Sequence, residues 1–590
     1  MQKNETVPAW AGALAGLTAG ALALGIAQLV AGFAGPETFP VVAVGDTAVD
    51  LTPAPVKDFA INTFGENDKT VLIGGVLVVL AGIAAVIGVL ARRRLAYGYA
   101  GLAVFGVVGA AAVLTRPGAG AADVLPTVVG VLCGGLALGW LLRRAGGGRG
   151  TVAAAPSKAG GGVATPEAGG EAAPEAGDEA AAGVGGAGAV SEVGGEGTVP
   201  EVGGEGTVGE VGGAGAGGEG AVERPAVMRA GAGERGFDRR RLITGVAGGI
   251  VVAGASAVLG RQLGGRRELD VTRVNLALPR PATPARPLPA GTDFRIPGLS
   301  PFITKNQDFY RVDTALVVPQ VDPRTWKLRI HGMVDRPLEI TYAELLNLPL
   351  TEADITLTCV SNEVGGPYVG NARWLGVRMA DLLRRAGLQP GADMLLSTSD
   401  DGFTCGTPVD VVMDGRDALF AIAMNGEALP FEHGFPVRQV VPGLYGYVSA
   451  TKWVVDVKVT RFDRDQAYWT PRGWAAKGPI KTESRIDVPK RGDSLKAGRT
   501  TIAGVAWAQH TGVDAVEVRV DRGEWRQARL AAVPGPDTWR QWALDWDATP
   551  GEHTIEARAT DAAGRTQTER QAPPAPDGAS GWPALTVQVA

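Results

Sequence analysis

The chain has few of the residues that hold small secreted domains or haem groups in place. It contains three cysteines and four histidines in 590 residues, and it has no Cys-x-x-Cys pair. A disulfide framework and a c-type haem attachment site are therefore excluded. The net charge of −5 and the lack of a basic stripe with interleaved aromatics argue against a nucleic-acid surface. No nucleic-acid partner is expected.

Four stretches in the first 144 residues lack charged side chains and are rich in apolar ones. They cover residues 10–33, 71–91, 96–114 and 124–142. Each approaches or exceeds the length that a helix needs to cross a bilayer, at about 1.5 Å per residue. The alternative is a set of helices buried in a soluble core, but four such stretches without a charge are hard to place there. Residues 1–144 are predicted to form a four-helix transmembrane region.

Charge between these stretches predicts their orientation. Arginines follow the second stretch at 92–94 and the fourth at 143–144, whereas the loop 34–70 carries six acidic residues and two lysines. Basic residues favour the cytoplasmic side of a membrane. The N-terminus is therefore expected in the cytoplasm, the loop 34–70 outside, and the chain inside again after the fourth helix.

Residues 145–238 consist mainly of glycine, alanine, glutamate and valine. A nine-residue near-repeat starts at positions 192, 201 and 210. Such residues cannot bury a core, so a disordered linker is predicted, with an acidic interaction tract as the alternative. At about 5–6 Å times the square root of its length, the linker would span roughly 50–60 Å.

A second apolar stretch, residues 239–262, begins with a basic cluster. Residues 238–243 read Asp-Arg-Arg-Arg-Leu-Ile, a pattern that resembles a twin-arginine export signal. An ordinary fifth transmembrane helix remains the alternative, and both interpretations place residues 270–590 outside the cytoplasm. The sequence leaves open whether the chain is cleaved after Ala257 in the small-residue run 255–257. A proline-rich tether, residues 263–290, follows.

The remaining chain divides into two globular sections. Residues 291–480 mix strand-like runs with amphipathic helices at 342–348 and 379–387, which predicts an α+β domain. Residues 481–590 contain short alternating strands separated by turn residues, which predicts an all-β domain. The strands are expected at 326–330, 355–359, 437–441, 453–459, 501–507, 515–520, 553–559 and 584–589.

Three short motifs in the first globular section occur in a distinctive order. Residues 357–366 read Leu-Thr-Cys-Val-Ser-Asn-Glu-Val-Gly-Gly, residues 433–438 read His-Gly-Phe-Pro-Val-Arg, and residues 452–453 read Lys-Trp. Together, over about half of the chain from Asn306 onward, they resemble the sulfite oxidase family of molybdenum enzymes. The resemblance implies a molybdopterin cofactor, two-electron oxygen-atom transfer and a small-molecule substrate.

The resemblance also implies roles for individual residues. Cys359 would be the metal ligand, because a soft thiolate is the protein donor that this family supplies to molybdenum. The residues implied to bind the pterin and its phosphate are Asn306, Tyr310, Arg311, His433, Arg438, Thr451 and Lys452. The alternatives are a buried core cysteine at 359, a disulfide from Cys359 to Cys405, a surface ion pair at Arg438, and a turn or helix-cap residue at Asn306.

The same resemblance makes the second globular section an immunoglobulin-like dimerisation domain, so a homodimer through it is expected. The tryptophans 507, 525, 539, 542 and 546 would then belong to its core and interface. No haem is expected in this chain, because all four histidines lie beyond residue 330 and the apolar helices contain none. Electrons are expected to pass to or from a separate protein.

Two other classes of function fit part of the sequence. A thiol enzyme using Cys359 with His433 would need a base beside the sulfur and a third orienting group. A cofactor-free surface scaffold would need none of the motifs. Neither accounts for the ordered set of motifs, so the prediction is an extracytoplasmic molybdenum oxidoreductase anchored in the plasma membrane.

Sulfite is predicted to be a poor substrate. Sulfite-oxidising members of the family place an arginine in a segment that ends in Val-Pro. Counting back from Pro319 puts Asp313 at the arginine's position, and counting forward from Asn306 puts Val312 there; only a one-residue gap would place Arg311 in that role. The family's active-site tyrosine follows a tryptophan by five residues. In this chain the residue five positions after Trp469 is Trp474, so a tryptophan stands where the tyrosine is expected. Asp313 and Trp474 would favour a neutral or cationic substrate such as an S- or N-oxide, unless Arg472 or Lys477 restores positive charge.

Overall fold

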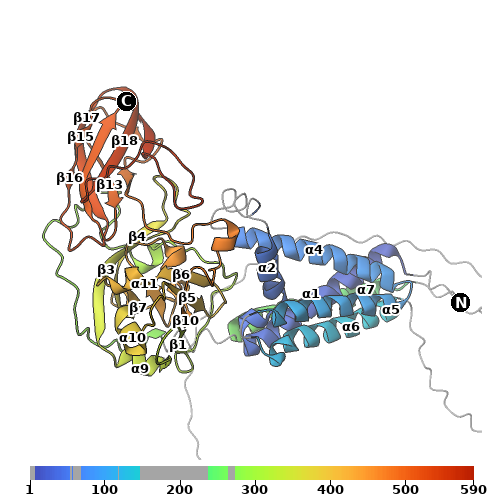
Figure 1. Cartoon of the computed structure of the whole chain (residues 1–590). Helices are drawn as coiled ribbons and strands as arrows, with labels where there is room; N and C mark the ends of the chain where they lie inside the picture. The colour runs from blue at the N-terminus through green and yellow to red at the C-terminus, as the bar shows by residue number, and fades with distance from the viewer. Residues whose placement is uncertain are drawn as a thin grey trace, which may run out of the picture. The chain divides into compact units, whose positions relative to one another are not determined.

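The structure is a computed structural model, and it describes residues 7–52, 56, 68–116, 119–145, 237–263, 273–274 and 276–590. The predicted linker 145–238 lies almost entirely outside these residues. Each part is considered by itself: an N-terminal set of apolar helices, a β-rich central domain and a C-terminal β domain (Figure 1).

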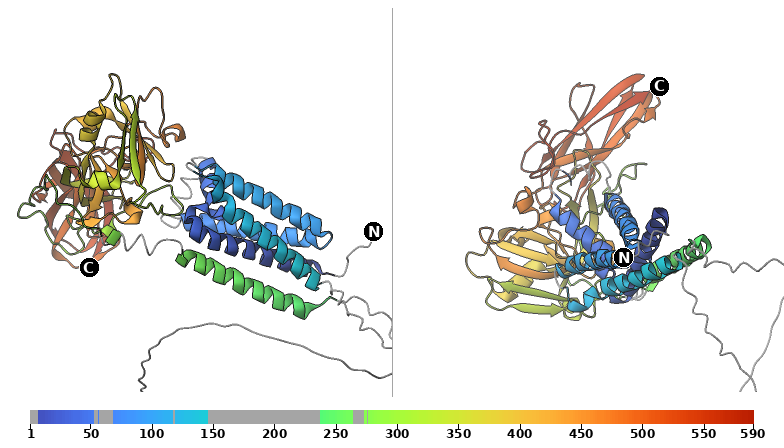
Figure 2. Two further views of the ribbon diagram at one scale, coloured as in Figure 1. Left: turned by 90° about the horizontal axis from the view of Figure 1, so that it is seen from below. Right: turned by 90° about the vertical axis from the view of Figure 1, so that its right-hand side faces the viewer.

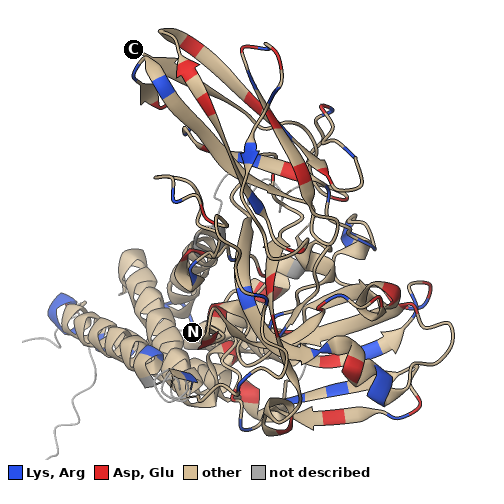
Figure 3. Ribbon diagram, turned by 90° about the vertical axis from the view of Figure 1, so that its left-hand side faces the viewer, with Lys and Arg blue, Asp and Glu red and all other residues tan. Residues whose placement is uncertain are grey.

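The N-terminal part consists of long apolar helices that run side by side (Figure 2). Five of the described helices are long and apolar enough to cross a bilayer by length and composition. Almost all of their residues are uncharged, whereas acidic and basic residues recur along the strands of the other two parts (Figure 3). These helices are α1 (Ala9–Ala34), α4 (Asp68–Ala91), α5 (Leu95–Leu114), α6 (Leu125–Ala145) and α7 (Arg239–Leu263).

Small residues allow α1 to approach its neighbours closely. A Cβ atom at Gly16 would lie 2.1 Å from the backbone oxygen of Ala84 in α4, and one at Gly25 would lie 2.5 Å from that of Ala253 in α7. Larger side chains at these positions would force the helices apart, which is why small residues mark close helix–helix contacts in membranes. Helix α7 therefore packs as a member of this bundle.

The predicted loop 34–70 contains a helix that the sequence analysis missed. Helix α2 (Pro40–Leu51) begins with a proline in its first turn, where the missing N–H is not needed. Ala43 of α2 is buried against Ala112 and Val113 of α5. The acidic residues spread along this segment obscured the short apolar run from which the helix is built.

The central domain contains two five-stranded sheets. The first has the order β2-β1-β10-β5-β6, and the second has the order β3-β4-β7-β8 with β9 paired to β7. The bounds in the first sheet are β1 (Lys327–Gly332), β2 (Leu338–Thr341), β5 (Met394–Ser399), β6 (Thr404–Pro408) and β10 (Val454–Thr460). In the second they are β3 (Leu350–Thr358), β4 (Val369–Arg378), β7 (Leu419–Met424), β8 (Glu427–Ala428) and β9 (Arg438–Val440).

Three short helices accompany these sheets: α9 (Tyr342–Leu346), α10 (Met379–Ala386) and α11 (Val409–Met413). Thr341 and Glu344 form a reciprocal cap that starts α9. Helix α10 ends at Gly387, whose φ of +76° suits glycine, as the sequence indicated. The two predicted helices are therefore present, each shortened at its C-terminal end.

The C-terminal domain is built from two sheets that enclose one apolar core. Their orders are β11-β13-β17-β16 and β12-β19-β18-β14-β15. Trp542 from the first sheet and Val516 from the second are both fully buried in this core. The strands are β11 (Glu483–Val488), β12 (Ser494–Leu495), β13 (Gly498–Trp507), β14 (Val513–Val520), β15 (Arg526–Gln527), β16 (Arg529–Leu530), β17 (Arg540–Ala548), β18 (Gly551–Asp561) and β19 (Ala584–Val589).

The central and C-terminal domains share buried contacts. Trp507 and Trp539 form an apolar cluster with Phe302 and Val369. The backbone N–H of Trp539 donates to the Thr356 hydroxyl at 2.7 Å. Four of the five predicted core tryptophans are buried, and Trp525 instead lies half-buried against Trp582.

Candidate functional site

Cys359 directly follows strand β3 and is buried, with 7% of its surface exposed. The backbone N–H of Ser361 donates to its Sγ at 3.4 Å. Burial raises the pKa of the thiol above its ordinary value, because a charged thiolate loses its hydration in the interior. All three cysteines are free, so the alternative of a Cys359–Cys405 disulfide is wrong for this structure.

His433 and Arg438 come from the two ends of one tight loop. His433 ends the 3-10 turn η5 (Phe431–His433), and Arg438 opens β9. Between them, Gly434 has a φ of +108°, and a Cβ there would lie 3.0 Å from the Cβ atoms of both Arg438 and Lys452. Glycine at this position therefore lets His433, Arg438 and Lys452 converge.

Arg438 is a buried cation that has no carboxylate partner among the described residues. Its Nη1 donates to the His433 carbonyl at 3.1 Å, and its guanidinium lies 5.0 Å from the centre of the Trp374 ring. Burial lowers the pKa of Arg438 to about 10. A buried charge is costly unless an anion compensates it, so this position suits the binding of an anionic group.

His433 is held as a neutral side chain. Its Nε2 donates to the backbone oxygen of Asn306 at 2.9 Å, which leaves Nδ1 as the acceptor. Burial lowers the pKa of His433 to about 4, and the nearby Arg438 and Lys452 add to that effect. The Phe309 ring packs edge-on against the imidazole with ring centres 5.6 Å apart.

Asp313 forms ion pairs with both Lys452 and Arg311. Lys452 Nζ donates to Asp313 Oδ2 at 2.7 Å, and Arg311 Nε donates to the same oxygen at 3.0 Å. The Asp313 side chain is 3% exposed, whereas that of Arg311 is 41% exposed. Burial lowers the pKa of Lys452 to about 8 even though Asp313 opposes the change. Lys452 and Asp313 are therefore buried together, and Arg311 lies nearer to solvent.

Tyr310 lies within electrostatic range of both Cys359 and Arg438. Burial raises the pKa of its phenol, the Cys359 thiolate raises it further, and the Arg438 cation lowers it. The structure thus brings the Cys359 segment, Tyr310 and the His433–Arg438 loop together. A Cβ atom at Gly446 would lie 3.9 Å from the Tyr310 hydroxyl and 3.8 Å from the Thr358 carbonyl, so the chain before Lys452 closes one side of this region.

Thr451 and Asn306 both use their side chains within the protein. Thr451 is fully buried, and its hydroxyl lies beside the Cys405 thiol, whose pKa burial raises and Thr451 lowers. Asn306 donates from Nδ2 to Met424 O at 3.3 Å and accepts from Asn425 Nδ2 at 2.8 Å. The role of Thr451 in cofactor binding stays a prediction, and the Asn306 amide fastens its own loop.

A polar cavity of about 450 Å³ opens beside His433. Its wall combines donors and acceptors with aromatic and aliphatic surface, which suits a planar polar molecule. The lining residues are Asn306, Gln307, Phe309, Arg311, Val318, Gln320, Phe431, Glu432 and His433. The cavity, the buried Arg438 without a carboxylate and a thiol at Cys359 fit a phosphorylated pterin with a thiophilic metal.

The place of Trp474 at the substrate stays a prediction, and its ring packs beside Tyr447, the residue after Gly446. Trp474 packs in an aromatic cluster with Tyr447 and Trp469, at ring-centre distances of 6.0 Å and 6.1 Å. Among the described residues, no hydrogen bond or ring contact links Trp474 to Cys359. Arg472 stacks on Tyr468 in the same loop, and Lys477 lies over the Phe462 ring.

Two further buried residues carry no local sequence signal, because only tertiary packing buries them. Tyr445 is 3% exposed, and its pKa is raised by burial first and then by neighbouring groups that include Glu483 and Cys359. Glu483 opens strand β11, is also 3% exposed, and has its pKa raised to about 8 by burial. Tyr445 thus lies within electrostatic range of both Cys359 and Glu483.

Parts of this chain are similar to known proteins. Residues 315–469 match the family profile described as "Oxidoreductase molybdopterin binding domain". The chain is 29% identical over 323 residues to "Sulfite oxidase, mitochondrial" of Homo sapiens, covering 46% of this chain and 58% of that protein. It is 32% identical over 162 residues to "Uncharacterized oxidoreductase YuiH" of Bacillus subtilis, covering 27% of this chain and 78% of that protein.

Among solved structures, the sulfane dehydrogenase SoxCD from Paracoccus pantotrophus is 28% identical, with a TM-score of 0.41. That similarity covers 45% of this chain and 74% of the SoxCD chain. The chain thus spans somewhat more than half the length of the mitochondrial relatives that it matches.

Proposed function

The chain belongs to the sulfite oxidase family of molybdopterin-dependent oxidoreductases, and on this premise we propose that it transfers an oxygen atom to or from a small molecule at Cys359. The single observation that carries this assignment is Arg438, a buried guanidinium without a carboxylate that donates to the carbonyl of His433, a residue lining the polar cavity. A cofactor phosphate supplies the missing negative charge. When bound, the molybdenum–pterin group supplies the two-electron oxygen-transfer chemistry.

The surrounding residues prepare the site for that group. Cys359 provides the thiolate ligand, and metal binding would lower the pKa that burial alone raises. Arg438 and Lys452 provide positive charge. Neutral His433 offers Nδ1 as an acceptor to the pterin edge, because its Nε2 is committed to Asn306. Asn306 and Tyr310 close the opposite edge.

A thiol enzyme is disfavoured by two observations. The His433 Nε2–H is occupied by the Asn306 carbonyl, and burial raises rather than lowers the pKa of Cys359. A nucleophilic cysteine needs a base or cation that lowers its thiol pKa. Alkylation by iodoacetamide at pH 7 tests this alternative: rapid labelling of Cys359 in metal-free protein would favour a thiol enzyme, and slow labelling favours the metal site.

The arrangement around Asp313 bears on the substrate. Asp313 occupies the predicted position of the family's sulfite-binding arginine, but two cations share its carboxylate oxygen. The local charge is therefore less negative than the sequence alone indicated, and the exposed Arg311 is the nearest group able to meet a substrate. A neutral, dipolar S- or N-oxide needs one such donor, whereas the sulfite dianion needs more fixed positive charge.

Turnover of two substrates tests the substrate class. The holoenzyme should reduce dimethyl sulfoxide or trimethylamine N-oxide with an artificial donor. It should oxidise sulfite at a kcat/KM below about 10⁴ M⁻¹s⁻¹, the lower end of the usual enzyme range. Sulfite oxidation above that value, with no oxide reduction, would assign the chain to sulfite instead.

We place the central domain outside the cytoplasm, tethered by the apolar helices. The arginine clusters and the five long helices support a multi-pass plasma-membrane anchor. Close packing of Gly25 against Ala253 supports retention of α7 after export, because cleavage after Ala257 would cut the helix within the bundle. Changing both Arg239 and Arg240 to lysine tests the route: export should fail for a twin-arginine signal and persist for an ordinary membrane helix.

A separate electron-transfer partner and a homodimer complete the proposal. The described apolar helices contain no histidine that could hold a haem, so electrons must reach the site from another redox molecule. The two-sheet C-terminal domain, which we infer to be immunoglobulin-like, is the expected dimer contact. Light scattering of the purified chain in detergent should give twice the protomer mass. Deletion of residues 481–590 would also disturb the central domain, because the two domains share buried contacts.

A further inference from the structure

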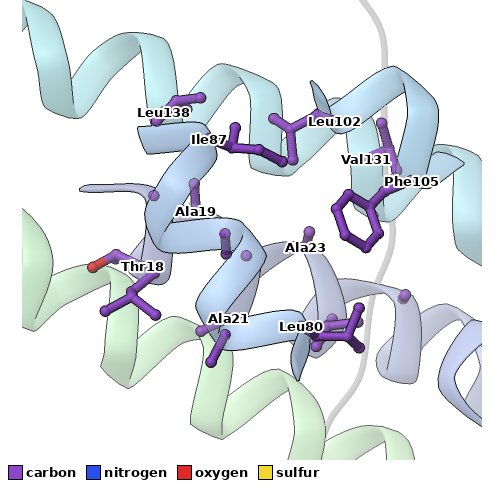
Figure 4. Close-up of a pocket in the computed structure, with 18 of the residues that line it drawn as sticks. Thr18, Ala19, Ala21, Ala23, Leu80, Ile87, Leu102, Phe105, Val131 and Leu138 are labelled. Carbon is purple, nitrogen blue, oxygen red and sulfur yellow. The ribbon is translucent and has the colours of Figure 1, made fainter. Parts of the chain in front are cut away.

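Two cavities of similar volume suit different ligands. The cavity within the helix bundle has a volume of about 460 Å³ and is lined by apolar side chains such as Leu80 and Leu102 (Figure 4). No charged residue lines it among the described helices. The polar cavity beside His433 instead has the charged side chains of Arg311 and Glu432 in its wall. A ligand that carries an anionic group therefore suits the central domain and not the bundle.

Lys452 is joined to the wall of the polar cavity without lining it. Its Nζ donates to the backbone oxygen of Glu432, a wall residue, at 3.0 Å and to Asp313 Oδ2 at 2.7 Å. The side chains of Lys452 and Asp313 are 9% and 3% exposed. The Asp313 carboxylate thus occupies a position at which a ligand anion would meet the ammonium group, and it leaves little of that group accessible.

The charges around Lys452 suit one strong anion but not two. Arg438 is the neighbouring cation, since a Cβ atom at Gly434 would lie 3.0 Å from the Cβ atoms of both residues. Arg438 has no carboxylate partner among the described residues, so these two buried cations and Asp313 together carry one positive charge. A phosphate monoester carries a charge of about −1.5 to −2 at pH 7, which balances the two cations alone but would leave a net negative charge beside Asp313. A buried net charge is unfavourable, so a phosphate and the Asp313 carboxylate compete for Lys452.

Asp313 has a second partner that leads toward solvent. Arg311 Nε donates to the same Oδ2 at 3.0 Å, and the Arg311 side chain is 41% exposed. Residues 309–326, between the 3-10 turn η4 (Asn306–Asp308) and β1, form no helix or strand. Asp313 can therefore turn outward with Arg311 without breaking a regular element and without losing this ion pair.

We propose that Asp313 is a stand-in for the phosphate group of the ligand: its carboxylate holds Lys452 before the ligand binds and yields that position to the phosphate on binding. The inference rests on the proposed function, which supplies a phosphorylated pterin as the ligand. A free oxyanion such as inorganic phosphate gains only the contacts at Lys452 and Arg438. The pterin also binds along the cavity wall and so gains enough to displace Asp313. Asp313 is thereby a specificity-determining residue that favours the phosphorylated cofactor over free anions.

Inorganic phosphate tests this competition without any turnover. The full chain is produced in cells that do not make the pterin, purified in detergent, and titrated with inorganic phosphate by calorimetry at pH 7. Asp313→Asn should bind phosphate at least about tenfold more tightly than the wild type, because Lys452 and Arg438 then lack a competing carboxylate. An affinity equal to that of the wild type would overturn the stand-in.

Two further variants locate the effect. Asp354→Asn is the matched control, because the Asp354 side chain is also 3% exposed and accepts two hydrogen bonds of 2.9 Å from Arg373. It removes the same charge from another buried ion pair and should leave the phosphate affinity within about twofold of the wild type. Lys452→Met combined with Asp313→Asn should remove the gain. A gain of equal size in Asp354→Asn, or one that survives Lys452→Met, would show that phosphate binds elsewhere and would overturn the assignment.

The loaded wild type decides the question without a variant, even if Asp313→Asn does not fold. A crystal structure of the chain purified with its cofactor should show Lys452 Nζ bonded to a phosphate oxygen and Asp313 still paired with Arg311. The distance from Lys452 Nζ to the Asp313 carboxylate should exceed about 4 Å, the limit of an ion pair. Retention of the Lys452–Asp313 ion pair in that structure would overturn the inference. Folded wild type from pterin-producing cells that contains neither molybdenum nor pterin would overturn the proposed function instead, and the phosphate titration would still judge Asp313.

Discussion

Replacing Arg438 by methionine should have opposite effects on the metal-free and the loaded protein. Burial lowers the pKa of Arg438 well below its ordinary value, to about 10, and no carboxylate compensates the charge in the described residues. At about 1.4 kcal/mol for each pKa unit, the unpaired charge costs the folded protein roughly 3 kcal/mol. Methionine fills a similar space over Trp374 without a charge. It gives up two hydrogen bonds, to the His433 carbonyl at 3.1 Å and to the Gln439 carbonyl at 3.5 Å, worth about 1 kcal/mol together because the second is long.

The metal-free Arg438→Met protein should therefore be more stable than the metal-free wild type by about 2 kcal/mol. In the loaded protein the sign reverses, because the wild-type guanidinium gains a phosphate partner that methionine cannot bind. Thermal melting of both forms, together with the molybdenum and phosphate content of each preparation, measures the two effects. The increase in melting temperature on loading should be large in the wild type and small in the variant.

Arg373→Met is the matched control. Arg373 makes two hydrogen bonds of 2.9 Å to Asp354, whose side chain is 3% exposed. Its removal leaves a buried carboxylate unpaired, so it should destabilise the metal-free and loaded forms alike. If Arg438→Met also destabilises the metal-free form and still retains molybdenum and phosphate, Arg438 is a structural residue and the reasoning is refuted.

Three further predictions follow from the same region. Cys359→Ser should fold and retain the pterin but lose turnover by at least about 100-fold, whereas Cys405→Ser should keep it; the reverse result would show that the wrong cysteine was assigned. Glu483 keeps a proton up to a pKa of about 8, so folding stability should fall as pH rises from about 4.5 to 8, and urea unfolding of Glu483→Gln should lack that decline. Asp313→Asn leaves Lys452 and Arg311 unneutralised and should raise kcat/KM for sulfite about tenfold or more; an unchanged value would remove Asp313 from substrate selection.

The sequence predicted those features that depend on local pattern. Alternation and turn residues located the C-terminal strands, and residues 584–589 form β19 within the predicted bounds. The glycine after α10 marked its end correctly. Uncharged length identified the five long helices. In contrast, α2 was missed, because acidic residues on one face concealed its apolar run.

The sequence pointed to candidate site residues but not to their pairings. Cys359, Tyr310, His433, Arg438 and Lys452 lie in loops and at strand ends of the central domain, and their roles stay predictions. The pairing of Asp313 with Lys452 joins residues 139 positions apart, and no local signal indicates it. The place of Trp474 at the substrate also stays a prediction, and in the structure its ring packs against Tyr447 and Trp469.

The most direct test of the central claim is the molybdenum content of the purified full-length chain. Elemental analysis of membrane-extracted wild-type protein should give close to one molybdenum per chain, with an equimolar pterin phosphate. Cys359→Ser should retain the pterin phosphate in a protein without turnover, and Arg438→Met should lose most of both molybdenum and phosphate. Folded, exported wild-type protein that contains neither molybdenum nor pterin would contradict the assignment of this chain as a molybdenum oxidoreductase.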